Sequence, residues 1–292
     1  MSVASMTGPT TMGIVAMMAD PETYLGPTVS ATFSVESTPD AITPGLVSGD
    51  IDVALVPANL AAVLYARTGG NVQVAGINTG NVLYVVARAG LVSSVEDLRG
   101  RTVYSTGQGT TPDVVMSTVL AAHQLTGQVD VRYVSQATEV ASRLLADPTG
   151  IAVLPEPYVT TVLARDPSLA VAIDLGAQFQ EATGTPVVTG VTVVRKDFAD
   201  AHRATVATFL QGAARSADAA NVSPQETGAL VAEQGITPSA EVAAQAIPRS
   251  GLMSVTGADM RAALTSYYQA LFAFDPQLIG GFLPGEDFYW VA

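Results

Sequence analysis

A phrase of thirteen residues occurs twice in this chain, and it constrains the possible folds more than any other feature. It reads VASMTGPTTMGIV at residues 3–15 and VYSTGQGTTPDVV at residues 103–115, an offset of 100. A second pair, VALVP at 53–57 and IAVLP at 151–155, has an offset of 98. Both pairs are explained by two similar α/β lobes, each with its own first strand, loop and helix. Five positions of the longer pair are identical without a gap: Val3/Val103, Ser5/Ser105, Thr10/Thr110, Thr11/Thr111 and Val15/Val115.

The first two thirds of the chain alternate short β-type runs with segments of helical period. The expected strands lie near 3–6, 29–35, 51–56, 72–77, 82–87, 102–105, 129–134, 151–154, 170–173 and 187–194. The expected helices lie near 11–19, 39–47, 58–66, 94–99, 112–125, 136–146 and 156–165. From Asp197 onward, helical patterns replace the strands. The fold class is therefore α/β, with two parallel or mixed sheets flanked by helices and a helical C-terminal third.

Composition excludes several classes of function. The formal net charge of −13 opposes binding to a phosphate backbone or an anionic membrane surface, so no nucleic-acid partner is expected. The chain has no cysteine, which excludes disulfides, thiolate catalysis and Cys-ligated metal. His123 and His202 lack partners at metal-ligand spacing, so we expect neither a metal nor a cofactor. The sequence also lacks a P-loop, a G-x-S-x-G motif and a dinucleotide fingerprint.

The candidate binding residues follow strands. In open parallel sheets, ligands bind beyond the carboxyl ends of the strands, and both Gly/Thr loops fall there. Thr10, Thr11, Thr110 and Thr111 either bond a ligand or cap the following helix. Asn59 offers an amide that either binds a ligand or lies at the surface, and Asn81, in the polar segment 78–81, either lines the pocket or belongs to a turn.

A carboxylate and an aromatic ring follow the strand expected at 151–154. Glu156, between two prolines, either selects a nitrogen-bearing ligand or interacts with the N-terminus of the next helix. Tyr158 either stacks on a flat ligand or packs in the core.

Five segments together resemble a known family. They are SGDIDVALVPANLAAVLY (48–65), VEDLRGRTVYSTGQGTTPDVV (95–115), IAVLPEPYVT (151–160), VVRKDFADAH (193–202) and IGGFLPGEDFYW (279–290). In this order they resemble the extracytoplasmic solute-binding proteins of ABC importers, which have the type II periplasmic-binding-protein fold. The most similar branch is the one that contains the thiamine-pyrimidine-precursor, taurine and alkylsulfonate binding proteins.

The resemblance implies a domain organisation and a site. Lobe I would comprise residues 1–85 and 190–292, lobe II residues 86–189, and strands near 82–88 and 187–194 would form a two-strand hinge. The ligand would bind in the interlobe cleft, with Gly107 and Thr189 added to the candidate residues above. It further implies a monomer that delivers a small molecule to an ABC permease with its ATPase. The protein would be extracytoplasmic, periplasmic or lipid-anchored on the outer face of a Gram-positive cell membrane, with the lipoprotein cysteine upstream of Met1 and the targeting segment outside these residues.

Three functions remain open on the sequence. The first is a solute receptor without catalysis, because no nucleophile–base pair is visible. The second is an enzyme on the same fold, either one that makes the thiamine pyrimidine or a menaquinone-pathway lyase. The third is a receptor that signals when it binds its ligand. Glu156 favours a neutral or cationic nitrogen-containing ligand similar to a thiamine precursor, although helix N-termini could also hold an anion.

Overall fold

The computed structural model describes residues 1–291, except for the side chains of residues 39 and 40. The chain divides into two compact units. Unit 1 consists of Met1–Gly80 and the described chain from Val188 onward, and unit 2 is Asn81–Val187. The chain therefore passes between the units twice, immediately before the strand that begins at Leu83 and shortly before the strand that begins at Gly190.

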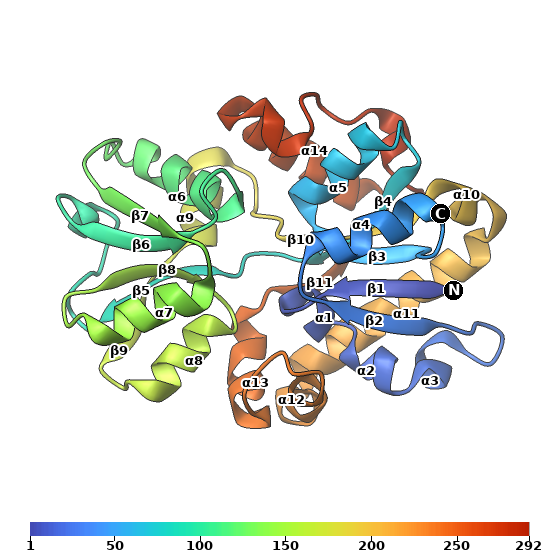
Figure 1. Ribbon diagram of the computed structural model, residues 1–292, viewed down its shortest axis with the longest axis horizontal. Coiled ribbons are helices and arrows are strands. Elements are labelled where there is room, and N and C mark those ends of the chain that lie inside the picture. The colour runs from blue at the N-terminus through green and yellow to red at the C-terminus, as the bar shows by residue number, and fades with distance from the viewer. Residues whose placement is uncertain (292) are drawn as a thin grey trace. The chain divides into compact units, whose positions relative to one another are not determined.

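The sheet of unit 1 is mixed, with strand order β11-β4-β10-β3-β1-β2 (Figure 1). Strand β1 lies parallel to β2 and β3, whereas β10 runs antiparallel to both β3 and β4. Strands β4 and β10 are buried along almost their whole length and form the centre of this sheet. The bounds are β1 (Ser2–Met6), β2 (Thr32–Glu36), β3 (Val53–Pro57), β4 (Val72–Thr79), β10 (Gly190–Arg195) and β11 (Leu252–Val255).

The sheet of unit 2 is also mixed, with strand order β7-β6-β8-β5-β9. Strand β6 is parallel to β7 and β8, and β5 is antiparallel to β8 and β9. The predicted fold class, two mixed sheets flanked by helices, is thus confirmed. The bounds are β5 (Leu83–Arg88), β6 (Thr102–Thr106), β7 (Asp130–Val134), β8 (Ile151–Pro155) and β9 (Leu169–Asp174).

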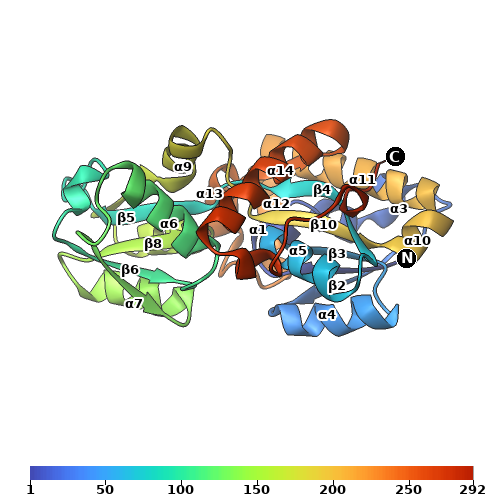
Figure 2. The same ribbon diagram turned by 90° about the horizontal axis from the view of Figure 1, so that it is seen from above.

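Helices cover both faces of each sheet. In unit 2, α6 and α9 lie on one side of the sheet and α7 on the other (Figure 2). This unit contains α6 (Thr111–Ala122), α7 (Ala137–Ala146), α8 (Tyr158–Arg165), α9 (Leu175–Thr183) and the 3-10 helix η1 (Glu96–Leu98). Unit 1 has five helices before Gly80, namely α1 (Pro9–Met12), α2 (Val15–Ala19), α3 (Pro21–Leu25), α4 (Pro39–Ser48) and α5 (Ala58–Arg67).

The C-terminal part of unit 1 is mainly helical, as predicted. The 20-residue helix α11 presents Phe209 and Leu210 to a core that also contains side chains of β1, β3 and β10. Complete burial of a Phe side chain such as Phe209 stabilises the fold by roughly 1.5–3 kcal/mol. The elements are α10 (Lys196–Ala201), α11 (Arg203–Val222), α12 (Pro224–Glu233), α13 (Ala240–Ala246), η2 (Ile247–Arg249), α14 (Gly257–Phe274), η3 (Pro276–Ile279) and η4 (Glu286–Phe288).

The sequence repeat corresponds to a repeat in the sheets. Strands β1 and β3 pair Ala4 with Ala54, and β6 and β8 pair Tyr104 with Ala152. The offsets between these pairs are 100 for the first strand and 98 for the second, the values found in the sequence. Strands β2 and β7 follow the same offsets in their registers with β1 and β6. The two Gly/Thr loops therefore occupy equivalent positions, after β1 in unit 1 and after β6 in unit 2.

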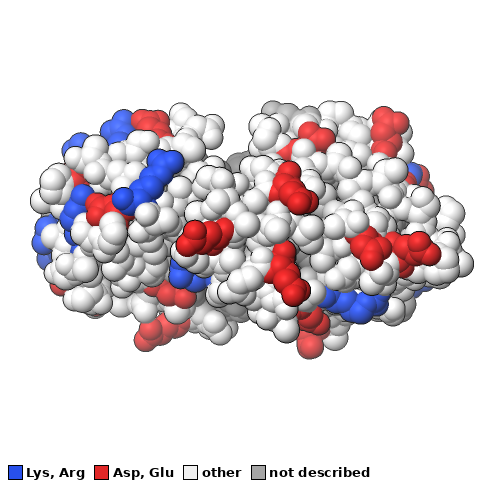
Figure 3. All heavy atoms as spheres, turned by 90° about the horizontal axis from the view of Figure 1, so that it is seen from below, with Lys and Arg blue, Asp and Glu red and all other residues white. Residues whose placement is uncertain are grey.

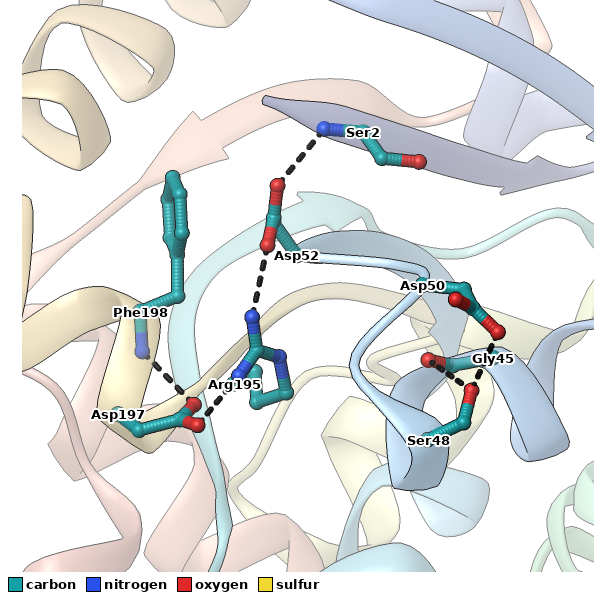
Figure 4. Close-up of polar contacts among 8 residues, drawn as sticks. All are labelled: Ser2, Gly45, Ser48, Asp50, Asp52, Arg195, Asp197 and Phe198. Atoms are coloured by element: carbon teal, nitrogen blue, oxygen red, sulfur yellow. Dashed lines mark hydrogen bonds and ion pairs between the residues drawn. The ribbon is translucent and has the colours of Figure 1, made fainter.

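A group of charged residues connects strands at the end of the unit 1 sheet where β1 begins and β10 ends (Figure 4). Arg195, at the end of β10, donates to Asp52 at 2.9 Å and also pairs with Asp197. The second oxygen of Asp52 accepts from the backbone N–H of Ser2 at 2.9 Å. Because Ser2 begins β1, this network connects the amino end of β1 to the final residue of β10. Its central pair, Arg195 and Asp52, is largely buried, and the network lies at the end opposite the Gly/Thr loop.

Candidate functional site

The Gly/Thr loop of unit 1 is closed onto the end of its own strand. Thr10 and Thr11 each donate a hydroxyl hydrogen bond to the carbonyl oxygen of Met6, both at 2.6 Å. The Thr11 hydroxyl also lies 2.7 Å from that of Ser5. Thr10 is 8% exposed and Thr11 is not exposed, so both hydroxyls hold the β1–α1 connection together. Neither hydroxyl provides a helix-capping bond.

The equivalent loop of unit 2 is organised differently. Thr110 is exposed and donates to the carbonyl oxygen of Gly107, a bond of 2.6 Å within the loop. Gly107 has φ +73°, and a Cβ there would lie 2.1 Å from the Thr110 hydroxyl, so glycine is required. Thr111 begins α6, is half-buried, and its hydroxyl has no hydrogen-bond partner among the described residues.

Two further candidates of unit 1 lie side by side at the end of β3. The backbone N–H of Ala58 donates to the Thr189 carbonyl at 3.0 Å, which places Thr189 next to the helix start that carries Asn59. The Thr189 hydroxyl is buried without a hydrogen-bond partner. The half-buried Asn59 amide likewise has none within the described part of the chain. Among the sequence candidates of unit 1, these two side chains have polar atoms left for a ligand.

The absence of a side chain at Gly190 allows the Thr10 loop and the end of β4 to lie close together. A Cβ at Gly190 would lie 2.6 Å from Asn78 Oδ1 and 2.6 Å from Thr10 Cγ2. The Asn78 amide is held between Thr192, to which it donates at 3.2 Å, and Thr79, from which it accepts at 2.8 Å. The ends of β1, β4 and β10 thus form one closely packed polar cluster.

Asn81 has a structural position in unit 2. Its Nδ2 donates to Asp174 at 2.8 Å and to the Leu83 carbonyl at 3.3 Å, while its Oδ1 accepts from Leu83 N–H at 3.0 Å. Asp174 in turn accepts from Ala177 N–H at 3.0 Å as the N-cap of α9. The Asn81 side chain therefore connects the start of β5 with the start of α9.

Glu156 is 1% exposed, and its carboxylate faces the first turn of α8. Its two oxygens accept from Thr160, one from the backbone N–H at 3.1 Å and one from the hydroxyl at 3.0 Å. A carboxylate at this position also interacts favourably with the helix dipole. Tyr158 packs half-buried against the unit 2 core, and its hydroxyl has no partner among the residues described.

The two histidines lie away from these loops. His123 follows the last residue of α6, at the opposite end of that helix from Thr111, and pairs with Glu96 at 2.7 Å. That hydrogen bond lowers the pKa of the Glu96 carboxyl. His202 follows α10, beyond the Arg195 end of β10. No group of His, Asp and Glu side chains in the described part of the chain could hold a metal ion.

The charges outside the loops are dispersed. Acidic residues outnumber basic ones by 16 to 7 in unit 1 and by 10 to 6 in unit 2. On the face shown in Figure 3, charged side chains occur singly or in small groups, and most of the surface is uncharged. No helix among residues 1–291 is both long enough and apolar enough to cross a membrane.

Asp113 was missed by the sequence reasoning. It lies in the first turn of α6, and its carboxylate accepts from the loop N–H of Gly109 at 2.8 Å. The signal was present, because Thr110 and Asp113 have the T-x-x-D spacing that resembles a capping box.

Comparison with solved structures identifies the fold. An ABC transporter protein from Parabacteroides distasonis matches with TM-score 0.85 and 23% identity, covering 100% of this chain and 98% of that one. The periplasmic aliphatic sulphonate binding protein SsuA from Escherichia coli matches with TM-score 0.77 and 14% identity, covering 100% and 92%. The alkanesulfonate-binding protein SsuA from Xanthomonas axonopodis pv. citri, bound to MOPS, matches with TM-score 0.66 and 15% identity, covering 98% and 94%. The chain therefore has the periplasmic-binding-protein fold, as the resemblance implied.

The family follows from the sequence match. The model of the menaquinone biosynthesis family matches residues 15–271, and the chain belongs to this family. Among curated proteins, no relative matches.

Proposed function

We propose that this protein is a solute-binding protein that captures a small organic molecule for an ABC permease and its ATPase. The observation that carries the proposal is the set of polar, uncharged groups at the carboxyl ends of the strands. In unit 1 these groups are the Asn59 amide and the Thr189 hydroxyl, and in unit 2 the Thr111 hydroxyl; none has an internal hydrogen-bond partner among the described residues. Binding sites gather a few polar groups of this kind.

The proposed ligand is neutral or cationic, contains nitrogen and is similar to a thiamine precursor. No Lys or Arg occurs in the loops at 8–11, 57–59, 107–111 and 156–158, or at residue 189. Amide and hydroxyl groups recognise ring nitrogens and exocyclic amines through neutral hydrogen bonds. The Tyr158 ring is the proposed surface for stacking. In this proposal Glu156 acts through the first turn of α8, since Thr160 donates to both of its oxygens.

The second candidate function is an enzyme of menaquinone biosynthesis, which the family match over residues 15–271 favours. Such an enzyme needs a group that transfers protons at the ligand. His123 and His202 lie away from the proposed loops, and the carboxylates of Glu156 and Asp174 both accept hydrogen bonds from neighbouring groups. A receptor without catalysis fits these positions better.

Native mass spectrometry of the purified protein tests the proposal. We expect one small nitrogen-containing molecule per chain, released unchanged after denaturation. A co-purified molecule that is converted into a second species during incubation would favour the enzyme. A protein that carries an aliphatic sulfonate would contradict the proposed ligand class while leaving the receptor function in place.

A further inference from the structure

The carboxylate of Asp113 connects three parts of unit 2. Its Oδ2 accepts from Gly109 N–H at 2.8 Å, and its Oδ1 accepts from the Ser117 hydroxyl at 3.0 Å. Oδ1 also accepts from the hydroxyl of Tyr133, which lies on β7. One side chain therefore joins the loop after β6, the first turns of α6 and the neighbouring strand.

The loop that Asp113 holds has little else to fix its conformation. Gly107 and Gly109 have φ of +73° and +70°, in the left-handed region where glycine has more freedom than other residues. Residues 108–110 are exposed. The N–H and the hydroxyl of Thr110 both donate to Gly107 O within the loop, while its carbonyl oxygen accepts from Val114 N–H at 3.0 Å where α6 begins. The bond from Gly109 to Asp113 is the one that ties the middle of this loop to α6.

In unit 1 the equivalent loop is held by different hydrogen bonds. At the repeat offset of 100, the equivalent of Asp113 is Gly13, which has no side chain to offer. There the hydroxyls of Thr10 and Thr11 close the loop directly onto Met6 O. In unit 2 it is Asp113 that bonds the loop, and the Thr111 hydroxyl makes no hydrogen bond within the described residues.

The Tyr133 hydroxyl is held in its protonated, hydrogen-bond-donating form. Burial, together with the hydrogen bond to Asp113, raises the pKa of the Tyr133 hydroxyl. The hydroxyl therefore stays protonated, and remains a donor to the carboxylate, to a higher pH than an ordinary tyrosine would.

We propose that Asp113 is a positioning residue for ligand binding: it holds the Gly107–Thr110 loop so that Thr111 meets the ligand from a fixed backbone. This inference rests on the proposed function. It concerns a residue that acts through the loop rather than by touching the ligand. The affinity of the protein then depends on the fraction of molecules in which the loop is held in place.

The test compares Asp113→Ala and Asp113→Asn with Asp97→Ala as a matched control. Asp97 also lies in unit 2, and its Oδ2 accepts three hydrogen bonds, from Ser93 N–H, Ser93 Oγ and Ser94 N–H, at 2.8, 2.9 and 3.0 Å. Its contacts are with the segment before η1 rather than with a candidate loop. The measurements are hydrogen exchange of the amides at 107–111, melting temperature, and calorimetric titration with the hydroxymethylated aminopyrimidine precursor of thiamine.

We expect Asp113→Ala to speed exchange at Gly109 and to weaken binding about tenfold or more, since an untethered loop is in place only part of the time. Asp113→Asn keeps an acceptor oxygen for Gly109, so it should recover most of the affinity. Asp97→Ala should lower the melting temperature without changing the affinity. Equal effects of both alanine variants on affinity, or unchanged exchange at Gly109 in Asp113→Ala, would overturn the inference.

The two proposals can fail separately. If the parent protein does not bind the aminopyrimidine, the proposed ligand class fails. The exchange measurement still decides whether Asp113 holds the loop, because it needs no ligand. If the parent binds and Asp113→Ala binds equally well, Asp113 has no positioning role, and the proposed function stands.

Discussion

The replacement Glu156→Gln separates a structural role of this carboxylate from direct contact with the ligand. Glu156 is 1% exposed and accepts two hydrogen bonds from Thr160 at the start of α8. The amide keeps one acceptor, but its NH2 group then faces a Thr160 donor. The loss of a charge-assisted bond in a buried site costs about 1.5–3 kcal/mol of unfolding free energy.

The assay is urea unfolding of the parent and the variant, followed by ligand titration of both. Glu181→Gln is the matched control, since Glu181 is an exposed carboxylate of the same unit, on α9. Its effect on the unfolding free energy should stay within about 0.5 kcal/mol. We expect Glu156→Gln to lose stability while the folded variant keeps its affinity within a few-fold. Unchanged stability with a large loss of affinity would refute the reasoning and make Glu156 a partner of a cationic ligand.

Three further predictions follow from the same contacts. Gly190→Ala places a Cβ 2.6 Å from Asn78 Oδ1, so it should lower the unfolding free energy measured with denaturant by about 1–3 kcal/mol. Gly13→Ala is the control and should be tolerated, because its Cβ meets Ala217 at an ordinary 3.8 Å. Equal effects of the two variants would contradict the packing described. Thr11→Val should destabilise the fold by about 1–3 kcal/mol, because it removes the bond to Met6 O and leaves Ser5 unpaired. Thr111→Val should leave the melting temperature unchanged and weaken ligand binding by about 0.5–1.5 kcal/mol. The reverse pattern in melting and calorimetry would assign the structural role to Thr111 and the binding role to Thr11. Burial raises the pKa of Tyr268 well above its ordinary value, so this hydroxyl ionises at lower pH in the unfolded chain than in the folded one. Stability should therefore fall as the pH rises above about 10, and the fall should be smaller in Tyr268→Phe. An identical slope for parent and variant in unfolding experiments at alkaline pH would contradict this prediction.

The repeated phrase made the fold class predictable, because each copy contains a complete strand, loop and helix start. The same repeat could not predict how the loops are held. Thr10 and Thr110 occupy equivalent positions, yet the first donates to the end of its strand and the second to its own loop. The second loop is instead tied to α6 through Asp113, whose carboxylate also accepts from Tyr133 on β7.

Several elements escaped the sequence patterns, and for α9 and β11 the physical reason is clear. The helix α9 has Gly176 in its first turn, which reads as a helix breaker; a Cβ there would lie 2.2 Å from Asn81 Cγ, so tertiary packing requires the glycine. Strand β11 has four residues and pairs with β4 only at Leu252 and Val255, which is too short for an alternating pattern. Likewise, the sequence left two roles open for Glu156, and its burial against Thr160 became visible only in the structure.

The central claim is that the protein binds a neutral or cationic nitrogen-containing solute without transforming it. The most direct measurement is calorimetric titration with the aminopyrimidine precursor and with ethanesulfonate, followed by chemical analysis of each compound after incubation with the protein. We expect stoichiometric binding of the aminopyrimidine, little binding of the sulfonate, and full recovery of the unchanged compound. Binding of the sulfonate alone, or recovery of a product, would contradict it.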